Sequence, residues 1–85
     1  MASSTIKKNL QYTDVTYNNI AVTANSYSLL GEYPTNALIA YVKGGNFSNV
    51  NSAKMVTLDT NGKAYLHNGS DSGTLISVTV RYLLG

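Results

Sequence analysis

The fold is decided by a stretch near the C-terminal end, TLISVTVRYLL, at residues 74–84. Its apolar and polar side chains alternate, which is the period of a β-strand with one buried face. One face would carry Ile76, Val78, Val80, Tyr82 and Leu84, and the other Ser77, Thr79 and Arg81. This stretch therefore predicts a strand that packs its first face on a hydrophobic core.

A hairpin is predicted just before this strand. Residues 54–58 read KMVTL and residues 63–67 read KAYLH, and the segment between them is Asp59-Thr60-Asn61-Gly62. Asn-Gly between two alternating runs is the strongest short-range hairpin signal, because both residues tolerate the positive φ of a type I′ turn. We therefore predict an antiparallel hairpin with a type I′ turn at Asn61-Gly62.

The first half of the chain also has strand character. Three further strands are expected at residues 6–17, 20–30 and 37–42, the first two bounded by Asn18-Asn19 and by Gly31. Residues 37–42, ALIAYV, are apolar throughout, which fits a central strand buried on both faces, and Gly44-Gly45 would break it. No window carries the apolar spacing and caps of a helix.

These segments predict an all-β fold, a small antiparallel β-sandwich of about six strands. Residues 6–85 would form a single domain, and residues 1–5 a disordered or artificially added leader. We expect a core of Leu38, Ala40, Val42, Val56, Leu58, Ile76, Val78 and Val80.

The composition favours an oligomer. The chain has 85 residues, no Cys and one His, so disulfides and Cys- or His-rich metal sites are unavailable to support a small core. Association between copies is the remaining support. The final strand has apolar residues at both ends, and either ordinary core packing or burial against a neighbouring copy would explain them.

The charge pattern argues against nucleic acid and membranes as partners. The net charge is only +2, and Lys7-Lys8 is the one adjacent basic pair, whereas nucleic-acid binding needs a concentrated basic face. No apolar run reaches the length of a membrane span. Charged residues make up 12% of the chain against about 25% in ordinary domains, and Asn, Ser and Thr replace them. Such an uncharged surface is common in exported or virion proteins that meet sugars.

Catalysis has little support in the sequence. The acidic residues are Asp14, Glu32, Asp59 and Asp71, and no G-x-S-x-G nucleophile turn is present. A carboxylate pair can cleave glycosides, but 85 residues are too few to hold a deep cleft. We therefore expect no enzyme, no cofactor and no metal.

Candidate ligand-binding residues come from the tyrosines and from one turn. The chain has seven Tyr, whose amphipathic rings suit sugar stacking and interfaces, although strands also favour Tyr in general. Tyr41 and Tyr82 fit a core or subunit interface. The candidate ligand-binding set, placed at predicted loop ends, is Tyr33, Tyr65, His67, Asn68 and Asp71. An ordinary solvated turn explains the last three equally well.

Three segments together carry a family resemblance. The chain places IAVTANSYSLL at residues 20–30, NGKAYLHNGS at 61–70 and TLISVTVRYLL at 74–84. In this layout it resembles the C-terminal domains of phage tail-fibre and baseplate receptor-binding proteins, which are similar to H-type lectin-like sandwiches.

The resemblance implies a parallel homotrimer at the distal end of a virion that binds a host cell-surface saccharide. No binding residue is carried over from the family. Two other readings stay open: a purely structural fibre, spike or head-fibre domain of a virion without its own ligand, and a free, extracellular bacterial lectin module.

Overall fold

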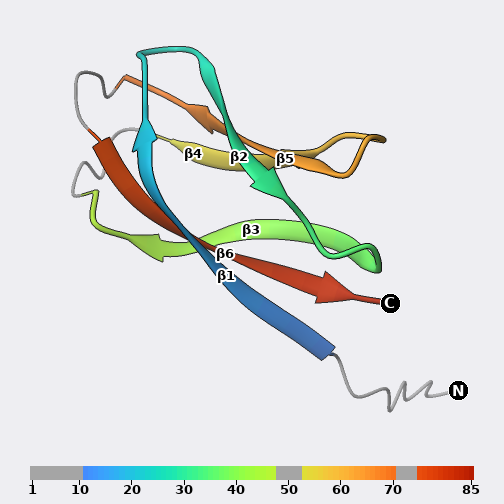
Figure 1. Cartoon of the computed structure of the whole chain (residues 1–85). Helices are drawn as coiled ribbons and strands as arrows, with labels where there is room; N and C mark the ends of the chain where they lie inside the picture. Colours follow the sequence, from blue (N-terminus) through green and yellow to red (C-terminus); the bar gives the residue numbers. More distant parts are fainter. Residues whose placement is uncertain (1–10, 48–52, 71–74) are drawn as a thin grey trace, which may run out of the picture.

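The structure is a computed structural model that describes residues 11–47, 53–70 and 75–85. It contains β1 (Gln11–Ala21), β2 (Tyr27–Glu32), β3 (Ala37–Gly45), β4 (Lys54–Leu58), β5 (Lys63–Asn68) and β6 (Leu75–Leu84). The strands form two antiparallel three-stranded sheets, ordered β1-β6-β3 and β2-β5-β4, which face each other (Figure 1). The described residues contain no helix, so the predicted all-β sandwich of six strands is confirmed. The expectation for residues 1–5 lies outside the described residues.

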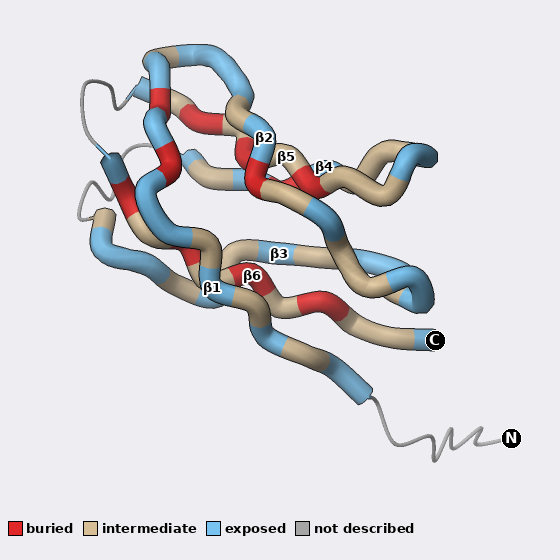
Figure 2. The backbone as a smooth tube through the Cα atoms, in the orientation of Figure 1, coloured by how far each residue is buried: buried red, intermediate tan, exposed pale blue. Residues whose placement is uncertain are grey.

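The core lies between the two sheets, and β6 supplies its largest share. The alternation of β6 is confirmed, because every second residue from Ile76 to Tyr82 is buried and those between are half-buried. The buried apolar residues, marked red in Figure 2, are Ile20, Val22, Leu30, Val56, Ala64, Leu66, Ile76, Val78, Val80 and Tyr82. The predicted central position of ALIAYV therefore belongs to β6.

The prediction for β3 is wrong in its position and in part of its burial. β3 is an edge strand that pairs only with β6, and its Leu38 is 73% exposed. Ala40 and Val42 of the expected core are partly buried and pack against it, as does Leu58 on β4. The strand also does not stop before Gly44-Gly45 but continues to Gly45, and its pairing with β6 is irregular after Ala37 and after Val42.

The stretch predicted as one strand at 20–30 is two strands. β1 runs through Asn18-Asn19 with a shift in register, where Asn19 has a φ of 59°, and ends at Ala21. Asn25 has a φ of 57° in the connection before β2 begins at Tyr27. Both positions use the tolerance of Asn for the left-handed region. The alternation nevertheless keeps its phase across the connection, because Leu30 points into the core like Ile20 and Val22, and Tyr27 and Leu29 point outward.

The hairpin between β4 and β5 is confirmed, but its turn is not type I′. Gly62 has a φ of 83°, whereas Asn61 does not share the positive φ. The carboxylate Oδ1 of Asp59 instead accepts hydrogen bonds from the backbone N–H groups of Asn61 (2.9 Å) and Lys63 (2.8 Å). The result is a three-residue loop with glycine at its left-handed position.

A polar contact between the sheets lies beside the core. Tyr82 on β6 is fully buried, and its hydroxyl is hydrogen-bonded to that of Tyr17 on β1. The Tyr17 hydroxyl donates to the backbone carbonyl of Glu32 at the end of β2 (2.9 Å). Burial, together with the contact to Tyr17, raises the pKa of the Tyr82 phenol well above its usual range. The ring of Tyr33 stacks on that of Tyr82 at 6.4 Å.

Candidate functional site

The outer face of the β2-β5-β4 sheet carries a cluster of aromatic and apolar side chains. We call it the aromatic face, and it consists of Tyr27, Leu29, Met55, Tyr65 and His67. The register places Tyr27 and Met55 on either side of His67, and Leu29 beside Tyr65. Tyr27 is 62% exposed, Leu29 54% and Met55 61%. Such large apolar exposure on one sheet face is a mark of an interaction surface.

The rings of this face contact one another. Tyr27 stacks on His67 with ring centroids 5.4 Å apart, and it meets Tyr65 edge-on at 5.7 Å. The His67 Nε2 atom and the Thr57 Oγ1 atom share a hydrogen bond of 2.7 Å. These contacts hold three rings in fixed relative orientations while leaving part of each accessible, an arrangement suited to binding a flat partner.

The alternation of β5 explains why the polar and aromatic side chains point outward. Ala64, Leu66 and Asn68 are buried, whereas Lys63, Tyr65 and His67 between them are half-buried. Lys63 pairs with Glu32 at 3.2 Å at one end of the face. Within the described strands, Lys63 and Glu32 are the charged side chains of this face. Because they pair with each other, the face suits an uncharged partner.

The structure brings together two of the five residues predicted to bind a ligand. Tyr65 and His67 both lie on the aromatic face. Tyr33 lies instead beside the core, and its hydroxyl donates to the backbone carbonyl of Asp59 (2.6 Å). Asn68 is 6% exposed and donates its side-chain amide to the carbonyl of Thr23 (2.8 Å), so the expectation that it lies open at a loop end is wrong. Asp71 lies outside the described residues.

Tyr27 is the functional candidate that the sequence analysis missed. It falls inside the stretch predicted as one strand, where the alternation starting at Ile20 already places it on the outer face. This alternation is the signal that could have found it as an exposed aromatic residue. Its position next to His67 depends on the register between β2 and β5, which the spacing alone does not give.

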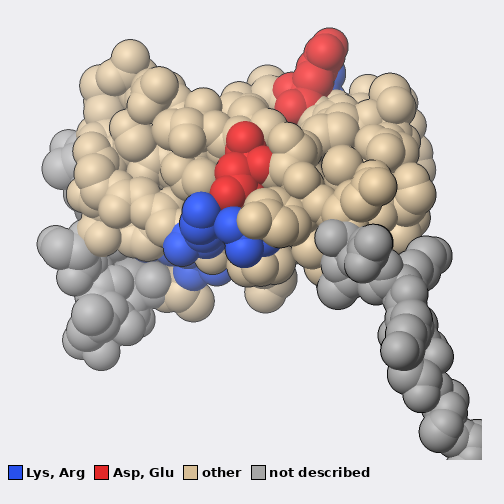
Figure 3. Space-filling model, turned by 90° about the horizontal axis from the view of Figure 1, so that it is seen from below, with Lys and Arg blue, Asp and Glu red and all other residues tan. Residues whose placement is uncertain are grey.

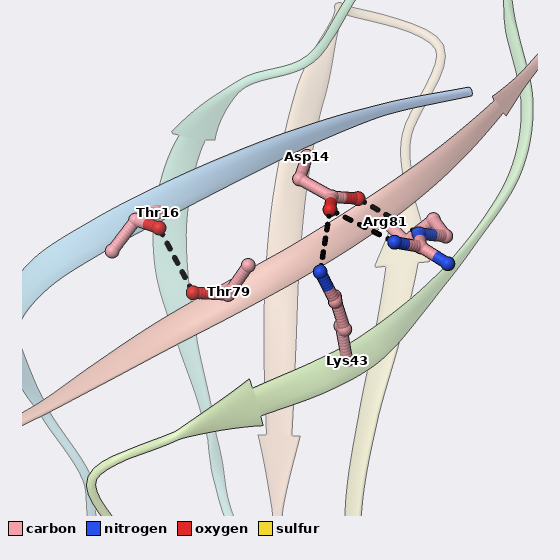
Figure 4. A network of polar contacts seen from close by, with 5 residues as sticks. All are labelled: Asp14, Thr16, Lys43, Thr79 and Arg81. Atoms are coloured by element: carbon pink, nitrogen blue, oxygen red, sulfur yellow. Dashed lines mark hydrogen bonds and ion pairs between the residues drawn. The ribbon is translucent and has the colours of Figure 1, made fainter.

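A second polar cluster lies on the outer face of the other sheet. We call it the charged row, and it consists of Asp14 on β1, Arg81 on β6 and Lys43 on β3 (Figure 4). Asp14 accepts two hydrogen bonds from Arg81 (2.9 and 3.0 Å) and one from Lys43 (2.9 Å). These bonds, from Arg81 first and Lys43 second, hold the pKa of Asp14 well below its usual range. The guanidinium of Arg81 also lies 4.0 Å from the ring centroid of Tyr12.

Neither cluster has the composition of a metal centre. Within residues 11–47, 53–70 and 75–85, no three His, Cys, Asp or Glu side chains come together in a way that could hold a metal ion. The aromatic face offers ring surfaces, an imidazole and hydroxyl groups, which can stack on a partner and hydrogen-bond to it.

Comparisons with known proteins give no match. No protein-family model, no curated protein and no solved structure matches it. In the part of the chain that the structure describes, no helix is long and apolar enough to cross a membrane.

Proposed function

We propose that this protein is a non-catalytic binding domain that holds a saccharide on its aromatic face. The observation that carries the proposal is the contact set of Tyr27, Tyr65 and His67, whose partly exposed rings lie on one open sheet face. Aromatic rings pack on the apolar faces of sugar rings, while hydroxyl and imidazole groups bond to sugar hydroxyls. A saccharide without charge fits best, because Lys63 and Glu32 pair with each other.

The biological setting that we propose follows from the resemblance to phage receptor-binding domains. In that setting the domain lies at the tip of a tail fibre or in a baseplate, and the saccharide belongs to the host surface. Each polar contact replaces a contact with water and contributes only about 0.5–1.5 kcal/mol, so single sites would bind weakly. Three sites in a trimer, and many trimers on a virion, would raise avidity by roughly 10²–10⁴ if they engage together.

The experiment compares Tyr27→Ala and Tyr65→Ala with the control Tyr12→Ala. Tyr12 matches Tyr27 in side chain and nearly in exposure, 54% against 62%, but lies on the other sheet. A glycan array first identifies a bound sugar, and titration with a short soluble oligosaccharide then measures binding per site, independently of assembly. We expect about tenfold weaker binding for each of the first two variants, equivalent to about 1.4 kcal/mol, and no change for the control.

Two results would overturn the proposal. One is an array without any bound saccharide, which favours a purely structural virion domain. The other is unchanged binding in both Tyr27→Ala and Tyr65→Ala, which moves the site away from the aromatic face. Asn68→Ala is unsuitable as a test, because Asn68 is buried and its loss would disturb the fold.

A further inference from the structure

The outer face of the β1-β6-β3 sheet is apolar at one end. The register aligns Tyr12, Leu83 and Ile39 in one row across all three strands, and all three project away from the core. Leu38 lies beside them at the bulge of β3. Tyr12 is 54% exposed, Ile39 57% and Leu38 73%. We call these four residues the apolar row; three of them are exposed and Leu83 between them is half-buried, which leaves an open apolar surface on this face.

The apolar row is followed directly by the charged row. Asp14 pairs in register with Arg81, and Arg81 with Tyr41, two positions along from the apolar row on each strand. Figure 3 shows the charged side chains gathered near the middle of this face, with uncharged side chains on both sides. Beyond the charged row, Thr16 and Thr79 share a hydrogen bond of 2.8 Å.

The size of the face determines how much of it a partner must cover. A stable interface buries about 800 Å² on each partner. Three strands about 4.8 Å apart and ten residues at about 3.3 Å each give a flat footprint of roughly 14 by 33 Å, about 460 Å² before side-chain relief. The apolar row alone is therefore too small. A partner must cover the whole face, and the charged row with it.

The charged row then selects the partner and its orientation. Asp14 lies on β1 at one edge of the sheet, and Lys43 lies on β3 at the other edge. We propose that this face binds a second copy of the chain, related by an axis parallel to β6, so that β1 of one copy lies against β3 of the next. This arrangement brings Asp14 to Lys43 of the other copy, and the apolar row to the apolar row.

Other orientations of a second copy satisfy the face less well. If the copies are related by an axis across the strands, alignment of the charged rows places Asp14 on Asp14 and Lys43 on Lys43. If the same axis aligns the apolar rows instead, each charged row lies beyond the end of the other sheet and meets no opposite charge there. Like charges brought together cost several kcal/mol. An axis along β6 avoids both faults and accommodates two or three copies, and it does not depend on saccharide binding.

The first test is the mass of the full chain in solution, measured by light scattering at micromolar concentration. We expect an oligomer for the wild type and a monomer for Leu38→Ser/Ile39→Ser. The matched control is Leu29→Ser/Met55→Ser, which removes two exposed apolar side chains (54% and 61%) from the aromatic face and should leave the oligomer intact. Circular dichroism establishes that each variant keeps its strands. A monomeric wild type, or dissociation by the control pair alone, would overturn the proposal.

The second test separates pairing between copies from pairing within one copy. Asp14→Lys and Lys43→Asp each lose the pair inside their own chain and place like charges at the proposed contact, so each alone should associate at least tenfold more weakly than the wild type. In an equimolar mixture, the Asp14→Lys chain is positive at both positions and the Lys43→Asp chain is negative at both. A contact between the two different chains therefore joins opposite charges, whereas a contact between identical chains joins like charges. Association restored in the mixture supports the proposal. A mixture that associates no better than the separate variants refutes the orientation.

Discussion

The hydrogen bonds of Tyr17 and Tyr82 predict unequal costs for two similar substitutions. The Tyr17 hydroxyl has one hydrogen to donate, and the carbonyl of Glu32, which can only accept, takes it. The bond between the two tyrosines must then be donated by Tyr82 and accepted by Tyr17. Tyr82 is fully buried, so its hydroxyl has no access to water if Tyr17 is changed.

The magnitudes follow from what each change leaves behind. Tyr82→Phe removes one hydrogen bond and leaves Tyr17 bonded to Glu32, so it should cost about 0.5–1.5 kcal/mol. Tyr17→Phe removes the bond to Glu32 and also leaves the buried Tyr82 hydroxyl without an acceptor, which adds about 1–3 kcal/mol. We therefore expect about 2–4 kcal/mol for Tyr17→Phe, a large part of the roughly 4–13 kcal/mol typical of 85 residues.

Urea denaturation at a fixed protein concentration measures these differences, because association would otherwise change the apparent stability. The decisive variant is Tyr17→Phe/Tyr82→Phe, in which no buried hydroxyl is left alone. This double variant should be no less stable than Tyr17→Phe. Its loss of unfolding free energy should be well below the sum of the losses in the two single variants. Additive costs, or a larger cost for Tyr82→Phe than for Tyr17→Phe, would show that the hydrogen-bond direction is wrong.

The remaining predictions concern the core, two titrating groups and the end of β3. Val78→Asp should prevent folding, since Val78 is 0% exposed and the carboxylate would be buried alone; a variant with native circular dichroism would refute the face assignment of β6. Above about pH 10 the protein should lose about 1.4 kcal/mol per pH unit, because only the unfolded state ionises Tyr82, and alkaline titration of Tyr82→Phe should show a shallower loss. Asp14→Asn should remove stability that the wild type has at neutral pH and loses as the pH falls below about 4, because hydrogen bonds from two cations lower the pKa of Asp14 in the folded state; equal pH dependence of urea midpoints in both proteins would contradict this. Gly45→Ala should be destabilising, since its Cβ would collide with the backbone oxygen of Ser77, whereas Gly44→Ala has open space and should be tolerated in thermal melts.

The sequence predicts local alternation well and the position of strands in sheets poorly. The faces of β6 follow from its two-residue period, because that period is a property of the strand itself. The run ALIAYV gives no such information, since an apolar residue looks the same whether its own core or another molecule covers it. The bulge at Leu38 and the edge position of β3 depend on pairing with β6, which no local pattern encodes.

The turns show the same limit at smaller scale. Asn61-Gly62 correctly marks a hairpin, but the turn type depends on the carboxylate of Asp59, which binds two backbone N–H groups. Two features of the sequence predict opposite environments for Asn68. Its place before a glycine predicts an exposed turn, whereas the period of β5 places it inward, and the period prevails because it buries the side chain against the carbonyl of Thr23.

The candidate site was predicted in part for a comparable reason. Tyr65 and His67 share one strand, so their common face could be read from their spacing. Tyr27 reaches the same face from another strand. Tyr33 follows the end of β2, packs beside the core and bonds to the backbone carbonyl of Asp59. Contacts between strands depend on register, which is decided by the whole fold.

The order of strands in the β1-β6-β3 sheet has a consequence for synthesis on the ribosome. β2, β5 and β4 are all available once residue 68 has left the ribosome, so their sheet can form before β6 follows. β1 and β3 both pair with β6, so neither has its partner until β6 emerges. Thr16 on β1 and its partner Thr79 on β6 are 63 residues apart in the sequence. Pairing across such a separation is slow. Until then β1 and β3 are unpaired strands of a nascent chain, open to mispairing with neighbouring chains on the same messenger RNA.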